Sequence, residues 1–152
     1  MAEIKEMYTV KQYPEEAKAK LSTLLEETKE VREFLDTLDN TIATSAAPTP
    51  EMLKEWARQA VGRGNYLRKK HAKLSAASIN EKDARYMEIK LECSQKGISF
   101  TDATTKIDAE GFIAPLRMAR DIFEAYVVSA DNIVSVCRMH LNKQLEETVD
   151  LK

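Results

Sequence analysis

The chain has 152 residues, with 23 basic and 25 acidic side chains and a formal net charge of −2 at pH 7. Charged residues make up 32% and apolar residues 43%, and there are only four Gly and four Pro, which excludes a disordered chain and the many turns of an all-β fold. No run approaches the roughly 18 apolar residues of a membrane span.

The first ten residues lack the basic-then-apolar layout of a signal peptide, so we expect a cytoplasmic protein without a membrane segment. The two cysteines, Cys93 and Cys137, are far apart in sequence and stand within apolar patterns. In a reducing compartment they are expected to be buried thiols rather than a disulfide.

A first helix is expected from Pro14 to near Ala43, because Pro is tolerated in a first turn and the acids that follow suit the positive end of the helix dipole. Its apolar residues recur at three- and four-residue steps, close to a heptad, which allows coiled-coil pairing. The stretch SAAPTP, residues 45–50, ends this helix. It divides the chain into an N-terminal amphipathic helix, residues 1–46, and a helical core domain, residues 47–152.

A second helix is expected to begin at Pro50 with Thr49 as its N-cap. Two glycines, Gly62 and Gly64, interrupt its pattern, and each costs on the order of 1 kcal/mol against Ala in a helix interior. They mark either a kink or a place where another backbone or a ligand comes close.

Residues 78–80 (SIN) predict a cap or turn, with Ser78 as the capping residue type, before a third helix over residues 81–96 with Gly97 as its C-cap. A short helix capped by Ser99 or Thr101 is expected next. A long helix over residues 110–148 then follows, with Pro115 in its first turns or bending it. The predicted fold is all-α, a helical bundle or long helical hairpins with an outlying N-terminal helix.

The sequence contains no motif that predicts catalysis. There is no HExxH, no GxSxG and no phosphate loop, and the two histidines, His71 and His140, stand in separate segments. The carboxylates of the later helices alternate with basic residues, as on a solvated helix face. We therefore expect a non-enzymatic protein with no metal site and no cofactor.

Positive charge is concentrated in residues 46–73, which carry seven bases and two acids, although the flanking segments are both acidic. At about 100° per residue, Lys54, Arg58, Lys69 and Lys73 fall within a sector of roughly 100°, opposite the apolar side of the helix. A row of long cationic side chains suits phosphates, and Tyr66 offers a ring for base stacking. The candidate nucleic-acid-binding residues are Lys54, Arg58, Arg63, Tyr66, Arg68, Lys69, Lys70 and Lys73.

Three other interpretations of this basic segment stay open. The row can pair with the acidic stretch EETKEVRE, residues 26–33, or it can be an ordinary solvated face. Gly62, Arg63 and Gly64 can instead lie against a small anionic ligand.

The C-terminal half resembles small helical proteins of tailed phages in its layout. The stretch RYMEIKLECSQKGISFTDATTKIDAEG, residues 85–111, predicts a basic amphipathic helix, a Gly-Ser/Thr turn and a mini-helix. The stretch RMARDIFEAYVVSADNIVSVCRMHL, residues 117–141, predicts a long helix that ends in a basic patch. Over residues 55–145 this order is similar to that of the UvsY-like recombination mediators. The resemblance implies a helical homo-oligomer that binds single-stranded DNA and helps to load a recombinase.

Two functions are therefore expected from the sequence. The first is a non-enzymatic helical oligomer that binds single-stranded nucleic acid through the basic helix, in a recombination-accessory role. The alternative is a phage-type protein-interaction module, either an inhibitor of host defence or an assembly factor. Its near-heptad first helix would dock on a host or phage protein or self-associate.

Overall fold

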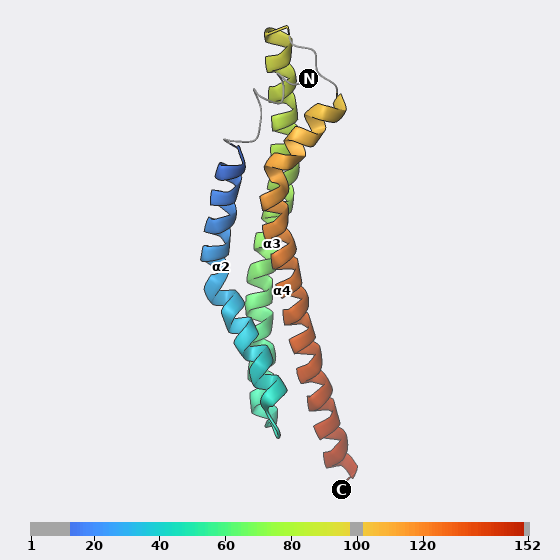
Figure 1. Cartoon of the computed structure of the whole chain (residues 1–152). Helices are drawn as coiled ribbons and strands as arrows, with labels where there is room; N and C mark the ends of the chain where they lie inside the picture. Colours follow the sequence, from blue (N-terminus) through green and yellow to red (C-terminus); the bar gives the residue numbers. More distant parts are fainter. Residues whose placement is uncertain (1–12, 98–101, 151–152) are drawn as a thin grey trace. The chain divides into compact units, whose positions relative to one another are not determined.

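The computed structural model describes residues 13–97 and 102–150. Within these ranges the chain forms three α-helices and no strand: α2 (Tyr13–Thr44), α3 (Pro50–Gln95) and α4 (Asp102–Asp150) (Figure 1). These helices pack against one another, which confirms the predicted all-α bundle. No helix in the described part of the chain is long and apolar enough to cross a membrane.

The ends of α2 and the start of α3 lie where the sequence places them. The Oγ1 atom of Thr49 accepts a hydrogen bond from the backbone N–H of Met52 at 3.2 Å, and Pro50 is the first residue of α3. Thr49 therefore satisfies one of the backbone donors that the first turn of a helix leaves unpaired.

The predicted turn at residues 78–80 and the separate helix over residues 81–96 are wrong, because α3 runs unbroken from Pro50 to Gln95. Ser78 does not cap a new helix. Its side chain is buried, and its hydroxyl donates a hydrogen bond to the carbonyl oxygen of Leu74 at 2.7 Å. A serine bonded back to the preceding turn fits a helix interior. The C-terminal end of α3 agrees with the prediction. Gly97 follows the last helical residues, and its φ of +65° is the left-handed conformation of a C-cap.

A second difference concerns α4, which is one helix from Asp102 to Asp150 rather than a short helix followed by one over residues 110–148. Pro115 lies inside this helix, beyond its first turns. Its ring removes one backbone N–H from the helical hydrogen bonds, but the helix continues on both sides. The predicted caps Ser99 and Thr101 lie outside the described residues.

The chain forms two compact units, and each unit takes a segment from all three helices. The first unit contains residues 1–26 and 72–121, and the second contains residues 27–71 and 122–152. The division of the chain at residue 46 stays a prediction.

Each unit has its own core. In the first unit the buried apolar residues are Leu74, Ile89, Cys93, Ile113, Leu116 and Ala119. In the second unit they are Leu35, Leu38, Leu53, Ala60, Leu67, Phe123, Ala130, Ile133, Val134 and Cys137. Both cysteines are free and fully buried, as the sequence predicts, and burial raises the pKa of the Cys137 thiol.

Two contacts set the register between α3 and α4 in the second unit. A Cβ atom on Gly64 would lie only 2.9 Å from the Cβ of Ala130. At the end of α4, Gln144 Nε2 donates a hydrogen bond to the carbonyl oxygen of Pro48, next to the start of α3, at 2.8 Å. Residue numbers therefore rise along one helix as they fall along the other, and the two segments are antiparallel. Gly64 thus marks a place where another helix comes close, through the Cβ atom of Ala130, whereas Gly62 faces open space.

The two glycines provide a matched test of this packing. Gly62→Ala should raise the free energy of unfolding by about 0.5–1 kcal/mol, because Ala restricts the unfolded chain and meets nothing in the fold. Gly64→Ala should lower it by about 1 kcal/mol or more, because the new methyl group overpacks against the short side chain of Ala130. Urea unfolding of both variants measures the difference. Equal stabilisation by both substitutions would contradict the close approach.

Candidate nucleic-acid interface

The eight candidate residues all lie on α3, but the structure gives them different surroundings. Seven belong to the second unit, and only Lys73 belongs to the first. In the second unit they divide into residues that contact α2, a residue that contacts α4, and residues that face away from both. This division decides which positive charges remain for a ligand.

Two of the basic residues are directed toward α2. The guanidinium of Arg63 lies over the ring of Phe34, 3.6 Å from its centroid, in a close cation–π contact. Lys70 Nζ is 3.2 Å from the carboxylate of Glu27. Glu27 belongs to the acidic stretch of residues 26–33, so part of the positive charge is used in intramolecular pairing.

Arg68 is directed toward α4. Its Nη2 atom donates to both carboxylate oxygens of Asp131, at 3.0 and 3.1 Å, and its Nη1 atom donates to Asn65 Oδ1 at 2.9 Å. The side chains of Arg68 and Asp131 are 52% and 62% exposed, so the pair adds little stability, but unlike Arg58 and Glu55 it joins two different helices. Arg68 therefore acts first as a tie between α3 and α4.

The remaining residues form a surface that we call the outer face of α3: Lys54, Arg58, Gly62, Tyr66 and Lys69. At about 100° per residue they fall within a sector of roughly 120°, on the side of α3 opposite Gly64. All five are exposed, and Tyr66 retains 38% of its accessible surface. Lys54 and Lys69 form no ion pair with any other residue in the described ranges, and from Arg58 to Lys69 the sequence contains no acid.

Acidic residues stand only at the N-terminal end of this face. Arg58 donates hydrogen bonds to both carboxylate oxygens of Glu55, at 2.6 and 2.9 Å. This contact lowers the pKa of Glu55 and raises that of Arg58. Both side chains are exposed, so the pair is in contact with water, where an ion pair contributes little to stability. A phosphate can compete for Arg58 at low cost.

The sequence analysis missed Arg138, which the fold brings to the same region. Counting from the contact between Gly64 and Ala130, at about 1.5 Å per residue, Arg138 on α4 lies at about the level of Lys54. It follows Asp131 by two helical turns, so it projects from the flank of α4 that faces Arg68. Arg138 is exposed and forms no ion pair within the described ranges. The sequence alone could not pair it with Lys54, because the pairing depends on the register of the two helices.

The hypothesis of a small anionic ligand at residues 62–64 is not supported by the geometry. Gly62 opens onto the outer face, Arg63 is seated on Phe34 and Gly64 is packed against Ala130. These three residues point in different directions and do not converge on one ligand. The described residues also contain no group of three or more His, Cys, Asp or Glu side chains that could hold a metal ion.

The arrangement on the outer face can bind anions by charge and bases by stacking. Comparisons of the chain with families of related proteins, with characterised proteins and with solved structures found no match. The resemblance of residues 55–145 to the UvsY-like mediators therefore stays a prediction.

Proposed function

We propose that this protein binds single-stranded nucleic acid without sequence preference, through the outer face of α3 together with Arg138. One observation supports the proposal above the others. The outer face keeps Lys54, Arg58 and Lys69 exposed on the same side of α3 as Tyr66, whose ring has Lys70 Nζ 5.7 Å from its centroid, whereas Arg63 and Arg68 contact α2 and α4. Cations next to an exposed aromatic ring are the combination that sequence-independent single-strand binding uses.

The expected binding is electrostatic and modest for one chain. Each phosphate that a Lys or Arg neutralises releases condensed counterions, which gives affinity but no sequence information. Four cations on one chain form a short strip. Self-association would join several strips and raise the total affinity, because the second and later contacts become intramolecular. The role that we propose is recombination-accessory, in a cytoplasmic homo-oligomer, and it carries no catalytic step.

Fluorescence anisotropy of a labelled 30-nucleotide strand tests the proposal. Binding should appear at low salt, and log K should fall against log[salt] with a slope near −3 if about four cations contact phosphates. Lys54→Glu combined with Lys69→Glu should weaken binding about tenfold or more, because two phosphate contacts become repulsive.

A matched control is the pair Lys18→Glu and Lys29→Glu on α2, which changes the net charge by the same amount at exposed lysines away from the outer face. It should alter the affinity by no more than about threefold, through the general field alone. Equal losses from both double variants would contradict a site on the outer face. No binding of the wild-type chain at about 50 mM salt would contradict nucleic-acid binding altogether.

A second candidate function, a protein-interaction module, is favoured by exposed apolar side chains in the first unit. Ile79, Met87 and Leu91 are 63%, 60% and 61% exposed, and together with Asp83 they follow one row of i, i+4 neighbours along α3. On α2, by contrast, Leu35 and Leu38 are buried and the other apolar residues of the stripe are half-buried. For this second function we propose the row on α3 as the surface for a second copy of this chain, and docking through the first helix stays a prediction.

Light scattering after size-exclusion chromatography tests this second function. If copies of the chain associate through the row on α3, Met87→Glu with Leu91→Glu should shift the oligomer to monomer, because two charges would have to be buried. The control Ser22→Glu with Ala114→Glu adds the same charges at exposed positions of α2 and α4, off this row, and should have a smaller effect. An unchanged molar mass in the Met87 and Leu91 variant would contradict this interface.

A further inference from the structure

A pocket of about 420 Å³ lies within the first unit, apart from the outer face of α3. Leu74 and Leu116, both buried, and Leu24, which is half-buried, provide its apolar surface. The small side chains Ala19 on α2 and Ala77 on α3 leave the space open. The volume is within the range of about 300–1,000 Å³ that is typical of small-molecule sites.

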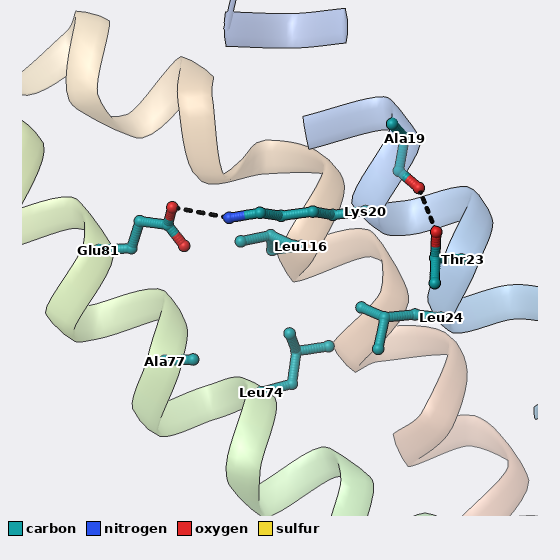
Figure 2. Close-up of a pocket in the computed structure, with 8 residues that line it drawn as sticks. All are labelled: Ala19, Lys20, Thr23, Leu24, Leu74, Ala77, Glu81 and Leu116. Carbon is teal, nitrogen blue, oxygen red and sulfur yellow. Dashed lines mark hydrogen bonds and ion pairs between the residues drawn. The ribbon is translucent and has the colours of Figure 1, made fainter. Parts of the chain in front are cut away.

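The pocket offers very few polar groups to a ligand. The hydroxyl of Thr23 is already used, because it donates a hydrogen bond to the carbonyl oxygen of Ala19 at 3.0 Å. The other polar groups in its lining are Lys20 and Glu81, whose Nζ and Oε1 atoms are 3.0 Å apart. Figure 2 shows Lys20 reaching from α2 toward Glu81 on α3, with Leu24, Leu74 and Leu116 projecting into the region between the two helices. A ligand must therefore have an apolar body and at most one polar end.

The two members of this ion pair differ in how easily they can leave it. The side chain of Lys20 is 51% exposed, and its long flexible stem can carry the ammonium into water. The side chain of Glu81 is only 25% exposed and has a shorter stem, so it has less freedom to move away. Displacing Lys20 is therefore the less costly change, and it leaves a carboxylate at the rim of an apolar pocket.

We propose that this pocket binds a small amphipathic amine, with a hydrocarbon or aryl body among the three leucines and a protonated amino group on Glu81. The side chain that now makes this contact has the same chemistry, an alkyl chain that ends in an ammonium. An incoming amine reproduces the contact to Glu81 and adds apolar area that the lysine does not fill. An anionic ligand would have to take Lys20 from Glu81 and would leave two carboxylates side by side.

The site is tested by NMR of the full-length protein with labelled leucine methyl groups. The protein is titrated with 4-phenylbutylamine, with 4-phenylbutyrate and with the neutral 4-phenylbutanol. The amine should shift the methyl signals of Leu24, Leu74 and Leu116, and it should bind about fivefold more tightly than the carboxylate. Equal or tighter binding of the carboxylate would overturn the proposal, as would the absence of shifts at these leucines.

Two variants separate the site from non-specific binding. Glu81→Gln should remove the preference for the amine over the alcohol, whereas Asp83→Asn, an exposed carboxylate on α3 outside the pocket, should keep it. Ala77→Phe should fill the space and weaken binding of all three probes. Amine binding that is unchanged in both Glu81→Gln and Ala77→Phe would place the probe elsewhere and overturn the assignment.

Discussion

The close contact between Gly64 and Ala130 is the constraint on which the second unit depends. A side chain at position 64 would lie 2.9 Å from Ala130, so only glycine lets α3 and α4 approach this closely. The contact fixes the antiparallel register, and the register brings Arg68 to Asp131 and Arg138 to the level of Lys54. The glycine therefore acts on the candidate site through the packing of α3 against α4.

The same packing divides the positive charge of α3 into two groups. Arg63 and Lys70 contact Phe34 and Glu27 of α2, and Arg68 contacts Asp131 of α4, so these three side chains make contacts between helices. Lys54, Arg58 and Lys69 lie on the opposite side, where no other helix segment of the second unit is packed against them. The segment looks uniformly basic in sequence. In the fold, the basic residues on one side of α3 contact other helices, and those on the opposite side stay exposed to a ligand.

Local signals in the sequence were sufficient for most of the fold. Thr49, Pro50 and Gly97 each act on their own turn of helix, and the structure places helix ends at all three. Ser78 misled the prediction because a serine can cap a helix or bond back within one, and only its burial in the first unit decides between them. The candidate site was less predictable for a similar reason. Its residue types stand in the sequence, but their partners come from helices far away along the chain.

The proposed nucleic-acid interface and the proposed amine pocket belong to different units, and their ligands would be bound by different interactions. The interface is a convex row of exposed cations that gains affinity from counterion release. The pocket is concave and apolar, and its one ion pair, Lys20 with Glu81, determines which charge the polar end of a ligand should carry. The two sites share no residue, so the substitutions that test one leave the side chains of the other unchanged.

We propose that the fold, and not the number of basic residues, decides which cations are available to a nucleic acid. NMR of the arginine side-chain Nε–Hε signals, recorded with and without a 30-nucleotide single strand, tests it directly. Shifts at Arg58 and Arg138, with the signals of Arg63 and Arg68 unchanged, are the predicted result. Equal shifts at Arg63 and Arg68 would contradict the division of charge, and unchanged signals at all four would contradict the interface.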